Sequence, residues 1–104
     1  MSQQRIAQAR ELFAKFPVND LAQFSLAQAL VDAGEQREAV THLRELAQRK
    51  PDWMVVQILL GKGQLALGDT AAAKATLTHA HALAVAQHHD GPREELAELL
   101  RTLD

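Results

Sequence analysis

Histidines are the residues of this sequence best suited to binding a metal ion, because neutral imidazole is the commonest metal ligand in proteins. There are five: His42, His79, His81, His88 and His89. Two ligands on one helix are expected four residues apart, so that both point to one side. His79 and His81 are two residues apart and His81 and His88 are seven apart, so neither pair has that spacing. We expect no physiological metal and no other cofactor.

The segment His88-His89-Asp90 has two interpretations. It could bind a metal ion at the end of a helix. Alternatively, its histidines supply favourable charge near a helix C-terminus. The order of residues along the chain is compatible with both interpretations.

Motifs for catalysis are weak. Gly61-Lys62-Gly63 has the composition of a phosphate-binding loop, but no Ser or Thr follows the lysine and we expect the segment in mid-helix. Ser2 and Ser25 lie outside any nucleophile motif. Glu95 and Glu98 have the spacing of charges on a helix surface. We therefore predict that the protein is not an enzyme.

Composition favours a single all-α domain covering residues 1–104. Hydrophobic residues make up 47% of the chain, mostly Ala and Leu, which are good helix formers, while aromatic residues make up 4%. The net charge is −2 without a basic stripe, so nucleic acid is not an expected partner. Cysteine is absent, and the most apolar window, 53–60, is shorter than the ~20 residues of a membrane span. We expect a cytoplasmic protein with no membrane contact.

The elements that would position functional residues are revealed by an internal repeat of 34 residues. The shift aligns small and large apolar residues at matching places: Leu26 with Leu60, Ala27 with Gly61, Gly34 with Gly68, Ala39 with Ala73, and Leu43 with Leu77. Each unit, 20–53 and 54–87, is predicted to form two helices, spanning 19–33 and 36–49, then 52–67 and 70–88. Gly34 and Gly68 are expected to end the first helix of each unit. The expected N-caps are Asn19 or Asp20, Asp52, and Asp69 or Thr70.

More helix is expected at both ends of the chain. Residues 3–16 place Ile6, Leu12 and Phe16 along one side, and Pro17 follows, so this segment is predicted to be the second helix of an incomplete repeat. Residues 91–103 have leucines spaced as on one helix face, with charged residues elsewhere. This helix is predicted to cap the stack, because the end of a repeat array needs a polar outer face.

The period and these positions resemble the tetratricopeptide repeat (TPR) family, as found in small bacterial TPR-containing proteins. The second unit matches the family pattern with Leu60-Gly61, Gly68-Asp69, Ala73, Leu77 and Ala80. The first matches with Leu26-Ala27, Leu30, Gly34, Glu38-Ala39, Leu43 and Pro51. Two departures stand out, since Gln23 and Gln57 occupy the early Trp position and Gln64 occupies one Tyr position. The resemblance implies a right-handed superhelical stack of about six helices in antiparallel hairpins.

The resemblance also implies a function, which is binding a protein or peptide as a scaffold or adaptor. The groove of such proteins is lined by the first helix of each repeat. Here its residues would be Phe24, Gln28, Asp32, Val55, Ile58, Leu59, Lys62 and Leu65. One subgroup clamps a peptide carboxylate with Lys and Asn at the positions of Phe24, Gln28 and Ile58, so such a clamp is not expected here.

The helix predicted over 53–67 is apolar nearly all round, and this has two interpretations. An all-round apolar helix is usually buried by its neighbours. Alternatively, Val55, Ile58, Leu59 and Leu65 form an exposed patch for a peptide or for a second copy of the protein. The alternative function is therefore a structural one, a self-associating helical-repeat protein that forms a homo-oligomer without a peptide ligand.

Overall fold

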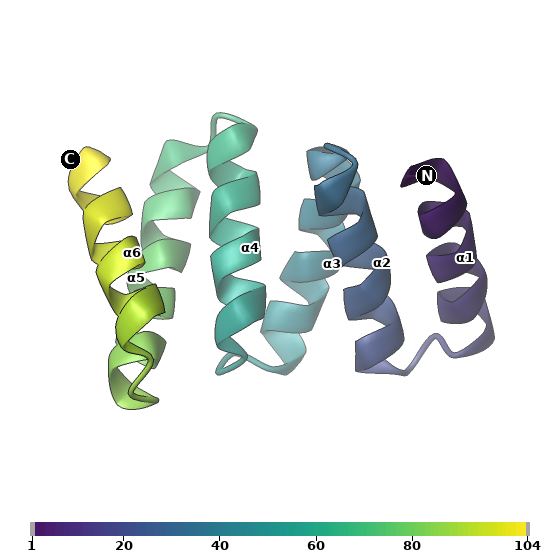
Figure 1. Ribbon diagram of the computed structural model, residues 1–104, viewed down its shortest axis with the longest axis horizontal. Coiled ribbons are helices and arrows are strands. Elements are labelled where there is room, and N and C mark those ends of the chain that lie inside the picture. Colours follow the sequence, from purple (N-terminus) through teal and green to yellow (C-terminus); the bar gives the residue numbers. More distant parts are fainter. Residues whose placement is uncertain (1, 104) are drawn as a thin grey trace.

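A computed structural model describes residues 2–103, and every regular element in this range is an α-helix (Figure 1). The six helices are α1 (Ser2–Lys15), α2 (Asp20–Asp32), α3 (Gln36–Arg49), α4 (Met54–Ala66), α5 (Thr70–Ala86) and α6 (Asp90–Thr102). The predicted all-α class with about six helices is confirmed. None of these helices has both the length and the apolar character that crossing a bilayer requires.

The helices stack in chain order, so that the N-terminus and C-terminus lie at opposite ends of an elongated molecule of 39 × 26 × 22 Å (Figure 1). In Figure 1, α2, α4 and α6 stand in front, while α3 and α5 lie behind them. Each helix packs on its neighbours in sequence, and α2 also contacts α4. The assignment of residues 20–53 and 54–87 to two repeats stays a prediction.

Helix ends follow the expected glycines. Gly34 and Gly68 have φ angles of +80° and +84°, in the left-handed region that glycine adopts without strain. The backbone N–H of the following residue, Glu35 or Asp69, donates to a carbonyl five residues earlier. These bonds satisfy carbonyl groups that the helix end would leave unpaired.

The N-caps agree with expectation at two helices and differ at a third. The side chains of Asn19 and Asp69 accept hydrogen bonds from the backbone N–H of Ala22 (3.0 Å) and Ala72 (3.3 Å). The prediction that Asp52 is an N-cap is wrong, because Trp53 is the N-cap of α4. The Trp53 side chain makes no capping hydrogen bond. The helix expected over 70–88 ends at Ala86, since the chain turns at His88.

The core consists of two clusters that meet at α4. The first lies among α1, α2, α3 and α4, and includes Leu26, Leu43 and Leu60. The second joins α4, α5 and α6 through Met54, Leu77, Ala80, Ala84 and Leu96. A Cβ atom at Gly61 would lie only 2.5 Å from Cδ2 of Leu77, so α4 and α5 cross closely there. The expectation that a small residue marks a helix crossing is confirmed at this position.

Candidate functional site

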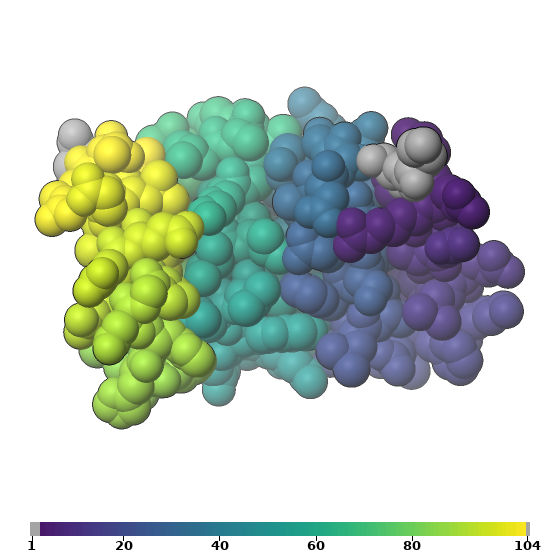
Figure 2. All heavy atoms as spheres, viewed as in Figure 1, coloured from purple at the N-terminus to yellow at the C-terminus, as the bar shows by residue number. Residues whose placement is uncertain are grey.

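The candidate site is the face of α2 and α4 on which sequence analysis placed the eight groove residues (Figure 2). Figure 2 shows this side of the molecule, with residues of α1, α2, α4 and α6 all visible from one direction. All eight predicted residues are at least partly accessible to solvent. Three of them are exposed, namely Asp32, Val55 and Lys62, and the other five are half-buried. The face is therefore accessible to a partner along both helices.

Helix α4 is buried on one side and accessible on the other, so both interpretations of its apolar sequence hold in part. Its buried residues are Met54, Val56, Gln57, Leu60, Gly61, Gly63 and Gln64. Val55 is 43% exposed. Ile58, Leu59 and Leu65 are half-buried, with Ile58 packed on the second core cluster and Leu59 on the first. The accessible side of α4 is apolar.

An aromatic pair marks the lower end of the face, where α2 meets the start of α4. The rings of Phe24 and Trp53 lie with centroids 5.0 Å apart and planes tilted by 30°. The Lys50 ammonium lies 5.8 Å from the Trp53 ring centroid, within the range of a cation–π contact. Trp53 was not predicted as a neighbour of Phe24, because it precedes α4 and lies 29 positions from Phe24 in the sequence.

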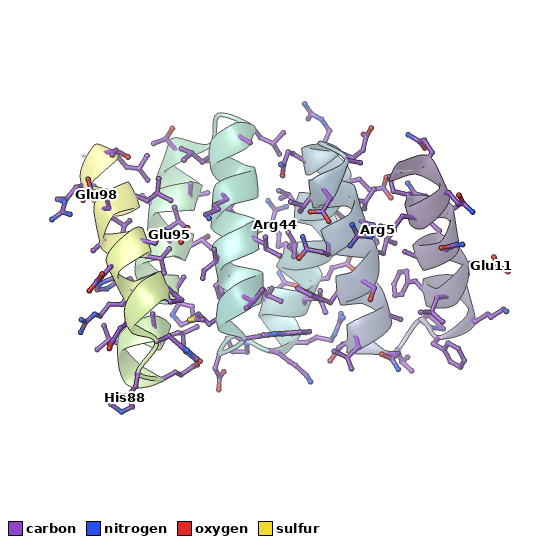
Figure 3. The ribbon with its side chains drawn as sticks, viewed as in Figure 1. Arg5, Glu11, Arg44, His88, Glu95 and Glu98 are labelled. Atoms are coloured by element: carbon purple, nitrogen blue, oxygen red, sulfur yellow. The ribbon has the colours of Figure 1, made fainter. Side chains whose placement is uncertain are left out.

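The charged residues of the face are paired within the molecule. Asp32 accepts a hydrogen bond from Nε2 of Gln28 (3.0 Å) and forms an ion pair with Arg5 of α1. Nζ of Lys62 lies 2.8 Å from Oε1 of Glu95 on α6. The hydrogen bond and charge of Lys62 lower the pKa of the Glu95 carboxyl below its usual value. Figure 3 shows Glu95 between α6 and α4, and Arg5 beside α2.

These two ion pairs bring in residues that sequence analysis did not assign to the site. Arg5 and Glu95 belong to the end helices, which were assigned only a packing role. The 34-residue shift does not predict the Lys62–Glu95 contact, because α5 has 17 residues where α3 has 14 and the register changes before α6. The structure therefore extends the face from α2 and α4 onto α1 and α6.

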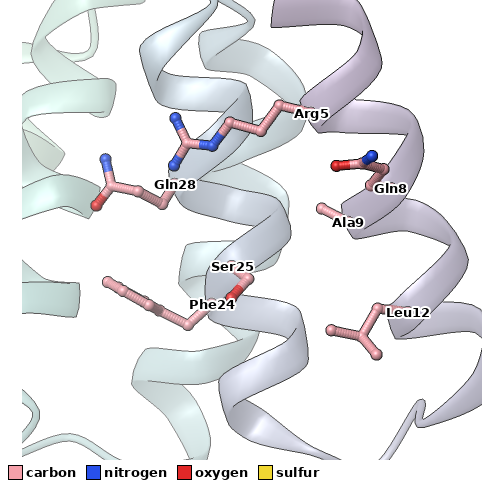
Figure 4. Close-up of a pocket in the computed structure, with 7 residues that line it drawn as sticks. All are labelled: Arg5, Gln8, Ala9, Leu12, Phe24, Ser25 and Gln28. Atoms are coloured by element: carbon pink, nitrogen blue, oxygen red, sulfur yellow. The ribbon is translucent and has the colours of Figure 1, made fainter.

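A hollow of about 310 Å³ opens between α1 and α2 at one edge of the face (Figure 4). It is lined by Arg5, Gln8, Ala9, Leu12, Phe24, Ser25 and Gln28. In Figure 4, Arg5 reaches from α1 toward Gln28, and Leu12 points toward α2. Arg5 and Gln28 lie in the upper part of the hollow, and Leu12 and Phe24 lie in its lower part beside Ser25.

Metal-binding residues do not gather anywhere in residues 2–103, since no three His, Asp or Glu side chains meet there in a way that could hold an ion. Nε2 of His79 lies 2.8 Å from the carbonyl oxygen of Pro51. His88 and His89 form the turn between α5 and α6. The expectation that the protein holds no physiological metal stays a prediction.

Comparison with known proteins identifies similar chains. No family model matches the sequence. A curated protein of Pseudomonas aeruginosa, named as a TPR repeat-containing protein, is 31% identical over 94 residues, covering 90% of each chain. Its name agrees with the family that the repeat pattern resembles.

Solved structures agree on the fold. A tetratricopeptide repeat domain protein from Salinibacter ruber matches with a TM-score of 0.73 at 22% identity, over 85% of this chain and 89% of that one. The TPR2B domain of yeast Sti1, solved in a complex with pHsp70, matches with a TM-score of 0.80 at 18% identity. The match covers 94% of this chain and 78% of that one. A protein from Bordetella parapertussis matches with a TM-score of 0.79 at 26% identity. The match covers 94% of this chain and 85% of that one. The predicted stack of helical hairpins is confirmed.

Proposed function

Because this chain belongs to the tetratricopeptide repeat family, we propose that it is a protein-interaction module that binds a peptide or protein segment on the face of α2 and α4. The observation that carries the proposal is the accessible apolar side of α4. It presents Val55, Ile58, Leu59 and Leu65 beside the aromatic pair of Phe24 and Trp53. The yeast TPR2B domain, solved with pHsp70, supports a binding role for a stack of this shape.

The proposed partner is an apolar segment rather than a free carboxylate. Lys62 and Asp32 are each held in an ion pair, with Glu95 and Arg5, so neither presents an uncompensated charge. Binding would gain mainly from removing apolar surface from water, at roughly 25 cal/mol per Å². The role proposed for the protein is therefore binding through apolar contacts, with no catalytic step.

A pair of matched valines provides the test. Val55 on α4 is 43% exposed and Val85 on α5 is 47% exposed, so neither substitution removes core packing. Proteins retained from the source cells by the wild-type chain would be compared with those retained by Val55→Glu and Val85→Glu. We expect Val55→Glu to weaken binding of the retained partner by about tenfold or more, the equivalent of about 1.4 kcal/mol. Val85→Glu should bind as the wild type does.

The same comparison can contradict the proposal. A partner that binds Val55→Glu as tightly as the wild-type chain would place its site elsewhere on the surface. A partner lost from Val85→Glu alone would assign binding to the face of α5. Circular dichroism of both variants would show that each remains folded, so that lost binding reports on the surface.

A further inference from the structure

At the N-terminal end of the stack, α1, the turn after it and the start of α2 together expose an unusual amount of apolar surface. Leu12 is 44% exposed, Phe16 52%, Val18 94% and Leu21 68%. These are four of the seven large apolar residues with exposed side chains in residues 3–103. Leu12, Phe16 and Leu21 line a second hollow, of about 300 Å³, together with Asn19, Ala22 and Ser25. A patch of this kind on a small protein marks an interaction surface.

Comparison of α1 with α3 shows what kind of element would cover this edge. Leu12 and Leu46 are 34 residues apart, yet Leu46 is 0% exposed while Leu12 is 44% exposed. The difference follows from neighbours, because α3 lies between α2 and α4, whereas α1 packs on α2, makes side-chain contacts with α3, and has no described helix on its other side. A further α-helix lying along α1 would therefore bury Leu12, as the neighbours of α3 bury Leu46.

The charges beside this patch indicate which helix that is. Glu11 and Lys15 repeat the four-residue spacing of Leu12 and Phe16, so a charged stripe runs beside the apolar one. Both charged residues are exposed, and neither forms an ion pair or hydrogen bond with another described residue. Figure 3 shows Glu11 pointing away from the stack at its edge. The edge therefore presents one free negative charge and one free positive charge.

We propose that the protein forms a twofold-symmetric dimer in which α1 packs antiparallel on α1 of a second copy. In this arrangement Leu12 lies against Phe16 of the second copy. Glu11 then comes close to Lys15 of the second copy. The twofold axis repeats each contact, so the patch is complementary to itself. Burial of Leu12, Phe16 and Leu21 supplies the apolar contact, and the two charge pairs fix the antiparallel direction.

The other end of the molecule argues against head-to-tail stacking. The charged residues of α6 include Arg93, Glu94, Glu95, Glu98 and Arg101, and all five are exposed. No large apolar side chain of the described part of α6 is exposed. A head-to-tail contact would bury this charged surface against an apolar one, which costs desolvation free energy. The closed pairing of two N-terminal edges instead sets each Glu11 beside a Lys15 of opposite charge.

Charge reversal tests the dimer and its direction together. Sedimentation equilibrium over a range of concentrations should give a mass approaching twice 11.4 kDa for the wild-type chain. Glu11→Lys places two basic side chains together across the axis, and Lys15→Glu places two acidic side chains together. We expect each variant alone to dimerise about tenfold more weakly, because two attractive pairs become repulsive. An equimolar mixture of the two variants, and the double reversal, should regain dimer formation.

Apolar substitutions locate the surface. Phe16→Ser should abolish the dimer, while Leu67→Ser, at a side chain 41% exposed elsewhere on the molecule, should leave it unchanged. A wild-type chain that stays monomeric at millimolar concentration would overturn the proposal. So would a dimer that survives Phe16→Ser, or one that is lost only with Val55→Glu. Partner binding on the α2–α4 face should persist in Phe16→Ser, so the two proposals fail separately.

Discussion

Gln23 shows how a polar residue is accommodated at a core position. Its side chain is 1% exposed. Its amide nitrogen donates to Oε1 of Glu45 (2.8 Å), and its amide oxygen accepts from the guanidinium of Arg49. Since Arg only donates and carboxylate only accepts, these partners fix the amide orientation. Nδ1 of His42 lies 3.1 Å from the same nitrogen.

His88 is the one non-glycine residue of the described chain with a positive φ angle, +59°. Its surroundings repeat those of Gly34 and Gly68. The His88 N–H donates to Val85 O (3.2 Å), and the His89 N–H donates to Ala84 O (2.9 Å), as at the ends of α2 and α4. A side chain in this conformation brings Cβ close to the following carbonyl oxygen, which costs about 1–2 kcal/mol. His88 therefore occupies a position that favours glycine.

Replacing this residue should stabilise the protein. His88→Gly removes the left-handed strain, and the added flexibility of the unfolded chain offsets part of the gain. We expect the free energy of unfolding to rise by about 0.5–1 kcal/mol, measured by urea denaturation. The control is Gln87→Gly, one residue earlier with φ of −96°, which should lower stability. A lower stability for His88→Gly would show that its imidazole makes a compensating contribution, such as binding an ion.

At the scale of elements, α1 is joined to the stack by ion pairs as well as by apolar contacts. Arg10 forms a two-pronged pair with Glu38 of α3, with one N–H···O distance of 2.7 Å. The hydrogen bond and charge of Arg10 hold the pKa of Glu38 below its usual 4.5. His42 lies 3.8 Å from the same carboxylate and contacts Phe13 of α1 edge-on. This side of α1 is thus attached through Glu38.

The stability that this pair supplies should depend on pH. Because the folded pKa of Glu38 is lowered, the contribution is complete above the unfolded value of 4.5 and is lost as pH falls through the folded value. Glu38→Gln should therefore lower the free energy of unfolding at pH 7 by about 0.2–1 kcal/mol, as for partly exposed pairs. The difference from the wild type should shrink at about pH 3. Urea denaturation at the two pH values measures both.

A surface glutamate supplies the control for that experiment. Glu94→Gln on α6 changes the same charge at a side chain for which no ion pair is seen within residues 2–103. It should shift stability less at pH 7 than Glu38→Gln does. An equal effect of both variants at both pH values would assign the change to net charge instead of the contact with Arg10.

Helices were the most predictable level of this molecule, because their signals are local. The helix predicted over 36–49 has the same bounds as α3, and Gly34 and Gly68 end helices as expected. The contact between Lys62 and Glu95 was not predictable, because the two residues lie on helices separated in the sequence by the 17-residue α5. The prediction of Asp52 as an N-cap was also wrong, since Trp53 adopts the extended backbone conformation of the N-cap residue.

Candidate site residues were predictable only as positions on a helix face. The family resemblance assigned residues on one side of α2 and α4 to the groove, and the structure leaves all eight at least partly accessible. Their partners were not predictable, because Phe24 contacts Trp53 and Asp32 contacts Arg5 across gaps of more than 20 residues in the sequence. Gln23 was seen only as a departure from the family pattern. Its role needs Glu45 and Arg49, which adjacent turns of α3 supply.

At the scale of the whole molecule, α4 is the helix that joins two halves of the core. Val56 and Leu60 belong to the first cluster, and Met54 belongs to the second. Helices contact almost only their neighbours in sequence. In stacked repeats, stability is then approximately a sum over units and the interfaces between neighbours. Loss of one cluster should therefore affect the nearest helices most.

Two buried leucines in corresponding places make this prediction testable. Leu43 lies in the first cluster and Leu77 in the second, 34 residues apart, and both are 0% exposed. Leu77→Ala and Leu43→Ala should each cost about 2–5 kcal/mol, because each leaves a cavity. In native-state hydrogen exchange, Leu77→Ala should accelerate the amides of α5 and α6 more than those of α2 and α3. Leu43→Ala should produce the reverse pattern.

Comparison of amide exchange rates in the two variants distinguishes a stack that opens in separate units from one that opens cooperatively. Amides that exchange through opening of a local unit respond only to mutations that destabilise that unit. If both variants accelerated every protected amide by the same factor, the molecule would open as a single unit through α4, and the two clusters would be one core energetically. A modular response would instead mean that α5 and α6 open while the α2 half of the proposed binding face stays folded. The N-terminal edge of α1 would stay folded as well, so Leu77→Ala should leave any dimer intact.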